Sequence, residues 1–174
     1  MKIQNKHKGL PADRHGFTLL ETTVAIGVLV AAIVAPLSLA SQSIKSASLA
    51  RSNIIVANLA QEGVELIKNY RSNNILQGQP WTDGMGFCFN PHGCQIDPQN
   101  LSIQKCAGSG CDFLKFDANL RLYNYQTGSD TLFKRTITMQ YINNPIEFQV
   151  TVSMTWNDRF GDHRFNLKTS MLDW

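Results

Sequence analysis

The chain opens with a short basic leader that runs directly into a long apolar segment. Residues 1–16 carry four Lys or Arg side chains against one Asp, and residues 17–40 are apolar apart from small polar residues and Glu21. About 20 apolar residues suffice to cross a bilayer, and positive charge before the span keeps that side in the cytoplasm. We therefore expect a single-pass inner-membrane protein whose C-terminal part lies outside the cytoplasm.

The junction between leader and span reads Gly16-Phe17-Thr18-Leu19-Leu20-Glu21. It resembles the type III signal of type IV pilins and type II secretion pseudopilins, whose usual core is Gly-Phe-Thr-Leu-x-Glu. In that family a prepilin peptidase cuts after the Gly and N-methylates the new first residue. The resemblance implies that Gly16 and Phe17 form the processing site, and that the mature protein enters a pilus or pseudopilus.

Two other interpretations of the same segment are an ordinary secretory signal peptide and an uncleaved membrane anchor. Ser38-Leu39-Ala40 fits a small-x-small cleavage site. An ordinary signal peptide, however, has an apolar region of roughly 7–15 residues without a carboxylate. A simple anchor explains the span but accounts for neither Gly16 nor Glu21.

Glu21 is costly at this place because a carboxylate at bilayer depth costs about 2.5–3.5 kcal/mol unless it is paired. The family resemblance implies that its partner is the N-terminal amine of a neighbouring subunit, so that Glu21 acts in assembly. The alternative is a Glu that lies at headgroup level and is solvated.

Pro36 lies inside the helix-like apolar run. An interior proline removes a backbone hydrogen bond and kinks or locally melts the helix. In pilins a proline in this part of the helix is associated with local melting inside the filament. A proline that the membrane helix merely tolerates is the other interpretation, and the two are compatible.

Helical spacing continues through residues 41–77, where apolar residues recur with a period near 3.6. We expect this soluble half of the helix to pack on a folded domain. The apolar residues that carry the period are Ile44, Ala47, Leu49, Ile54, Ala57, Leu59, Leu66 and Tyr70. Residues 59–65 are similar to the corresponding helix of minor pilins and of I-type minor pseudopilins. Within them, Gly63 either marks close packing or is tolerated at a cost of about 1 kcal/mol.

Residues 78–112 are rich in Gly, Pro, Asn and Asp, which predicts a long loop region. It contains all four cysteines, Cys88, Cys94, Cys106 and Cys111, on the side of the membrane where disulfides form. We favour the local pairs Cys88–Cys94 and Cys106–Cys111, because both loops are short and contain Gly, over nested pairing. Zinc is a competing role, but the spacing lacks the paired Cys-x-x-Cys pattern, so no metal is expected.

Residues 113–174 alternate with a period of two in four runs, which predicts half-buried strands. The runs are Leu114–Leu122, Phe133–Tyr141, Ile146–Trp156 and Phe165–Met171. Short connections between them favour an antiparallel meander with one face on the helix. The expected fold class is therefore α+β, a long N-terminal helix packed on a C-terminal antiparallel sheet of about four strands.

No motif in the sequence supports catalysis or a cofactor, so we expect a protein that is not an enzyme. Asp158 and Asp162 flank a turn and could bind calcium as some pilins do, although ordinary turn chemistry accounts for them. The formal charge is +3, and the leader supplies all of it, since four basic minus one acidic residue is also +3. A near-neutral mature chain argues against general nucleic-acid binding.

We therefore expect a structural minor pilin or pseudopilin. The partners that the resemblance implies are the prepilin peptidase, other pilin subunits, the inner-membrane assembly platform and the lipid bilayer. An alternative is a tip-located binding module, an adhesin or a DNA-capturing subunit, that uses the Cys-rich loop. In the family the tip subunit commonly lacks the spaced Glu, so the presence of Glu21 favours a subunit that stacks beneath another.

Overall fold

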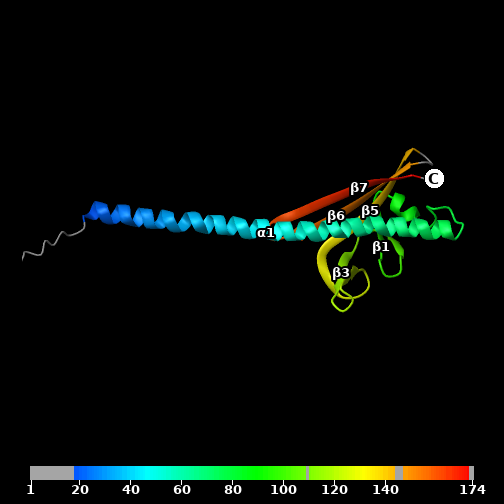
Figure 1. Ribbon diagram of the computed structural model, residues 1–174, viewed down its shortest axis with the longest axis horizontal. Helices are drawn as coiled ribbons and strands as arrows, with labels where there is room; N and C mark the ends of the chain where they lie inside the picture. Colours follow the sequence, from blue (N-terminus) through cyan, green and yellow to red (C-terminus); the bar gives the residue numbers. More distant parts are fainter. Residues whose placement is uncertain (1–17, 109, 144–146, 173–174) are drawn as a thin grey trace, which may run out of the picture. The chain divides into compact units, whose positions relative to one another are not determined.

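The computed structural model describes residues 18–108, 110–143 and 147–172. It begins with one long helix, α1 (Leu19–Leu76), followed by a short 3-10 helix, η1 (Gly86–Phe89), and seven strands (Figure 1). The chain forms two compact units, one ending at Ile44 and the other beginning at Lys45. The second unit holds the sheet and the C-terminal half of α1, so the expected α+β class is confirmed.

The sheet has seven strands, all paired antiparallel, where the sequence predicts about four. Its central strand pairs with β6 along one edge and with β3 and β1 along the other. The strands are β1 (Cys94–Ile96), β2 (Ile103–Lys105), β3 (Phe113–Asp117), β4 (Leu122–Asn124), the central β5 (Ser129–Asn143), β6 (Glu147–Asp158) and β7 (Gly161–Leu172). The expected meander corresponds to β5, β6 and β7.

The first predicted strand is in fact a hairpin. β3 ends at Asp117 and β4 begins at Leu122, so the chain turns where the sequence analysis expected a continuous strand. The Asp117 carboxylate accepts the backbone N–H groups of Asn119 and Leu120 at 2.9 and 3.1 Å, and Arg121 takes a φ of 54°. An Asp that bonds the backbone two residues on stabilises a turn, and this local bonding outweighs the period-two pattern.

Two further strands and η1 lie in the segment that was expected to be loop. β1 is buried along its whole length, and its Cys94 pairs with Ile137 of β5. β2 pairs only with β1 and is largely exposed. Strands of three residues carry no readable alternation, so their existence depends on the neighbouring strand rather than on local pattern.

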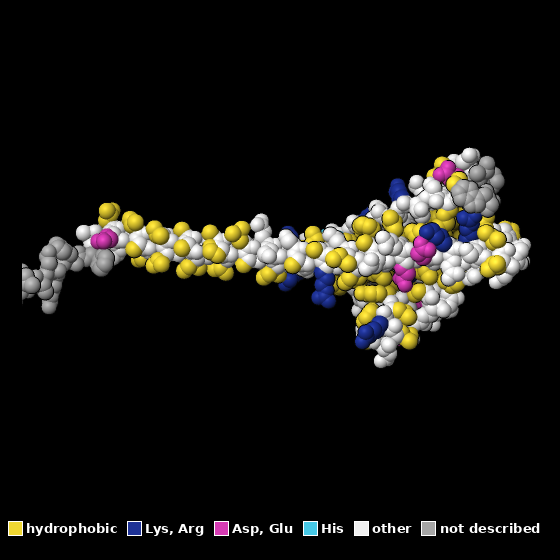
Figure 2. Space-filling view, viewed as in Figure 1, with side chains coloured by type: hydrophobic (Ala, Val, Ile, Leu, Met, Phe, Trp, Pro, Cys, Tyr) yellow, Lys and Arg dark blue, Asp and Glu magenta, His cyan; other side chains and the backbone are white. Residues whose placement is uncertain are grey.

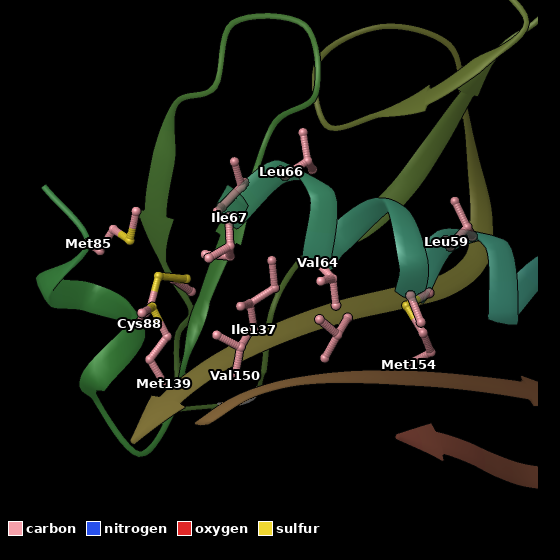
Figure 3. Packing of buried hydrophobic residues seen from close by; sticks show 14 of the residues in the cluster. Leu59, Val64, Leu66, Ile67, Met85, Cys88, Ile137, Met139, Val150 and Met154 are labelled. Carbon is pink, nitrogen blue, oxygen red and sulfur yellow. A yellow bond between two sulfur atoms is a disulfide. The ribbon is translucent and has the colours of Figure 1, made fainter. Parts of the chain in front are cut away.

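The core lies between α1 and one face of the sheet (Figure 3). On α1 the buried residues recur at helical spacing: Val56, Leu59, Ala60, Gly63, Val64, Leu66 and Ile67. On β6 the predicted alternation is confirmed, with Phe148, Val150, Val152, Met154 and Trp156 buried and the residues between them half-buried. The predicted helical stripe was wrong at Ile44 and Ile54, which are 61 and 64% exposed, and at Ala47, which is also exposed.

One charged side chain, Arg135, lies within this apolar layer and is fully buried. Its guanidinium donates to the Glu62 carboxylate at 2.6 Å, to the Leu59 carbonyl at 3.3 Å and to the Ile96 carbonyl at 3.1 Å. These bonds offset the cost of removing the charge from water. They also tie β5 to α1 and β1.

Candidate functional site

The N-terminal part of α1, residues 19–44, presents an apolar surface without a polar stripe. Every large hydrophobic side chain of this apolar segment is more than half exposed, from Leu19 at 82% to Ile44 at 61%. Figure 2 shows hydrophobic atoms along the visible face of the segment. A helix that is apolar all round requires lipid or other helices around it. Within the described residues, α1 is the one helix long and apolar enough to cross a membrane.

Glu21 lies in the first turn of α1 and is the sole charged residue of the apolar segment. Its backbone N–H donates to the Thr18 hydroxyl at 3.3 Å. Thr18 and Glu21 have the Ser/Thr-x-x-Glu spacing of a capping box, a signal that the sequence analysis missed. A carboxylate near a helix N-terminus is also favoured by the helix dipole. Glu21 therefore fits the start of the helix, and its role in assembly stays a prediction.

Three hydroxyl groups of the apolar segment are satisfied inside the helix itself. Thr22 and Thr23 donate to the carbonyls of Leu19 and Leu20 at 2.9 and 2.8 Å, and Ser41 donates to Leu37 at 3.1 Å. Polar groups bonded in this way can enter hydrocarbon, where an unsatisfied hydroxyl would be costly. Along the apolar segment, Glu21 is the charged group, and a charge in hydrocarbon is the most costly to leave without a partner.

Pro36 lies inside α1, and the helix continues through it. Because proline has no N–H, the carbonyl of Ala32 loses its usual partner one turn ahead. The local melting that the pilin resemblance implies concerns a filament and stays a prediction. The proposed processing residues Gly16 and Phe17 lie outside the described residues.

The four cysteines form two local disulfides, Cys88–Cys94 and Cys106–Cys111. The first joins η1 to β1 inside the core, and the second closes the turn between β2 and β3. No cysteine of the described chain is free, and no group of three or more His, Cys, Asp or Glu residues there could hold a metal ion.

The polar side chains of this Cys-stapled region bond one another. Gln95 donates to Asp112 at 2.8 Å and to Gln104 at 3.1 Å, and it accepts the Asp112 N–H at 2.9 Å. The buried Asp97 carboxylate accepts the backbone N–H groups of Gln99 and Tyr125 at 2.8 and 3.0 Å. Because their donors and acceptors are used within the fold, these groups serve structure.

Asp158 and Asp162, the candidate calcium ligands, face different partners at the β6–β7 turn. Asp158 accepts the Phe160 N–H at 2.7 Å and lies 3.0 Å from His163 Nε2, while Asp162 accepts from Asn157 at 2.6 Å. The Phe160 hydrogen bond, with the smaller contribution of His163, holds the pKa of Asp158 below its usual value. The geometry is that of ordinary turn chemistry.

An open hollow of about 500 Å³ lies beside this turn, and its lining includes Phe113, Leu132, Lys134, Thr155 and Arg164. Most of these side chains belong to the sheet face turned away from α1, as the register of β5, β6 and β7 requires. Lys134 lies over the Phe113 ring, 4.3 Å from its centroid.

When the chain is compared with protein-family models, with curated proteins and with solved structures, none of the three comparisons finds a match. The function is therefore inferred from the chain's own residues. The features that stand out are the apolar segment, its one carboxylate and the disulfide-stapled α+β unit that follows.

Proposed function

We propose that this protein is a structural subunit, a minor pilin or pseudopilin, of a type IV pilus or a type II secretion filament. It is made as an inner-membrane precursor and cut after Gly16 by a prepilin peptidase, which methylates Phe17. Extraction from the membrane then places the apolar segment in the filament core and the α+β unit at its surface. Its work is packing, with no catalytic step.

The observation that carries this proposal is Glu21 in the first turn of α1, within an apolar segment that holds no other charge. In hydrocarbon a carboxylate needs a positive partner, and cleavage after Gly16 creates one, the amine of Phe17 on a neighbouring subunit. A charge pair at low dielectric is strong and sets the axial register of two helices. The internal bonding of the Cys-stapled region supports a structural role for the unit outside the core.

Glu21→Ala and Glu21→Gln test the proposal. Both variants should insert and be cleaved normally, because losing a carboxylate makes insertion easier. Both should fail to enter filaments, because the neighbour's amine loses its partner. The matched control is Glu65→Gln, which makes the same change on an exposed part of the same helix. The measurement compares the membrane-bound and sheared-filament fractions in cells that produce each variant.

Intact mass of the mature chain provides the second readout. A start at methylated Phe17, abolished by Gly16→Val, supports processing by a prepilin peptidase. A start at Ser41 would instead indicate ordinary signal peptidase. Normal filament incorporation of Glu21→Ala would contradict the assembly role even if processing occurs as proposed.

A further inference from the structure

The turn between β6 and β7 contacts α1 at the first residue of the second unit. Lys45 Nζ lies 5.3 Å from the centroid of the Phe160 ring, and the guanidinium carbon of Arg159 lies 4.9 Å from the same centroid. In Figure 1 the turn, where β6 passes into β7, lies beside the stretch of α1 near residue 45. Two cations thus converge on one aromatic ring. We call the side chains of Lys45, Arg159 and Phe160 the basic turn.

Two carboxylates flank the basic turn, and the pKa of Asp158 is lowered by the Phe160 hydrogen bond and, to a smaller extent, by the charge of Arg159. Asp158 is engaged by His163 and by the Phe160 N–H, and Asp162 by Asn157. Within the described residues, neither Lys45 nor Arg159 forms a salt bridge. Two cations held over one ring repel each other, so an anion placed beside them would be stabilising.

The position of Lys45 in the chain indicates what that anion is. Lys45 follows Ala40, the end of the apolar run, by five residues of helix, a rise of about 7.5 Å. The headgroup layer on each side of a bilayer is about 5–8 Å thick, since the hydrocarbon core is about 30 Å and the whole bilayer about 40–45 Å. With residues 17–40 in the bilayer, Lys45 therefore lies at headgroup level, where Lys, Arg and aromatic side chains are favoured.

We propose that the basic turn is a docking surface for anionic phospholipid headgroups while the subunit is anchored in the membrane. Lys45 and Arg159 bind the phosphates, and Phe160 enters the interface beside them. This surface brings the first residue of the second unit and the β6–β7 turn to one membrane contact. The inference rests on the membrane anchoring in the proposed function but is independent of filament assembly.

The test uses the full chain reconstituted in nanodiscs of phosphatidylcholine alone or mixed with phosphatidylglycerol. Hydrogen–deuterium exchange is measured on peptides that cover residues 157–164. In anionic discs we expect slower exchange of this turn, by about fivefold for each engaged basic side chain. Lys45→Glu and Arg159→Glu should each remove the difference between the two lipids. Lys168→Glu, a charge reversal at an exposed site on β7, should leave it unchanged.

Equal exchange in the two lipids would overturn the proposal, as would an equal loss of protection in Lys168→Glu. A chain that fails to enter nanodiscs would refute the membrane anchoring itself, and so the proposal that rests on it. Filament assembly plays no part in the measurement, so a failure of the assembly role is distinguishable.

Discussion

The Arg135 guanidinium donates to the Glu62 carboxylate over 2.6 Å, joining the central strand to the helix at the middle of the core. The two side chains are unequal partners, because Arg135 is fully buried whereas the Glu62 side chain is 35% exposed. Removing Glu62 leaves a buried charge without its counter-ion, whereas removing Arg135 leaves a carboxylate that water can reach. This asymmetry allows a specific prediction about stability.

Glu62→Ala should lower the free energy of unfolding by about 2–3 kcal/mol, below the 3–5 kcal/mol typical of a fully buried pair because Glu62 is partly hydrated. Glu65→Ala is the control, since its ion pair with Lys68 is exposed and such pairs contribute at most about 1 kcal/mol. Urea unfolding followed by near-UV circular dichroism measures both. Arg135→Met removes the other partner of the pair. A smaller loss of unfolding free energy for Glu62→Ala than for Arg135→Met would contradict the asymmetry.

Gly63 lies where α1 packs tightly against side chains of β5 and β6. A Cβ atom there would lie 3.0 Å from Val152 Cγ1 and 3.1 Å from Arg135 Cδ. Gly63→Ala should therefore destabilise the protein by about 1 kcal/mol net, because overpacking outweighs the gain in helix propensity. Gly86→Ala, where a Cβ meets no atom within 4 Å, should be near neutral in the same unfolding measurement. A stabilised Gly63→Ala would show that Val152 and Arg135 move aside easily.

The parts of the fold that the sequence predicted are those in which local pattern and final environment agree. β6 alternates along its whole length, and its apolar residues are the buried ones. The long helix was predicted because apolar residues recur at helical spacing. Gly63 had two possible interpretations, and the structure shows that it marks close packing.

The parts that were missed depend on contacts distant in sequence. In the alternating pattern of its strand, Arg135 falls among the residues that face the core, and a buried Arg needs a partner. That partner, Glu62, is 73 residues away in the sequence, so no local pattern identifies it. The basic turn likewise depends on Lys45 meeting Phe160 across the unit. At the start of α1 the missed signal was local, since the Thr18–Glu21 spacing could have indicated the helix cap.

The two disulfides should differ in their effect on stability even though their loops are similar. The sequence separations are 6 and 5, so chain entropy gives each about 2–4 kcal/mol. All four cysteines are buried, but Cys88 and Cys94 belong to the hydrophobic core cluster, whereas Cys106 and Cys111 lie outside it. Removing the sulfurs of the first pair therefore also leaves a cavity in the core. The Cys88→Ala/Cys94→Ala double variant should therefore unfold at lower urea than Cys106→Ala/Cys111→Ala. Thiol titration of the unfolded, unreduced wild-type chain should find no free thiol.

The β3–β4 hairpin should loosen in acid because of Asp117. Its hydrogen bonds from the Leu120 N–H, then from Thr127 and the Asn119 N–H, lower its pKa below the usual 3.8. A carboxyl whose pKa is depressed by folding stabilises the folded state above its unfolded pKa, and this contribution is lost as the pH falls through the folded pKa. We therefore expect the hairpin amides to lose exchange protection below about pH 4, the ordinary range for Asp.

Asp117→Asn keeps an acceptor for both N–H groups but cannot titrate, so it should lose less protection between pH 5 and pH 3 than the wild type does. The measurement is pH-dependent amide exchange across residues 113–124, and an equal acid response in both proteins would locate the titrating group elsewhere.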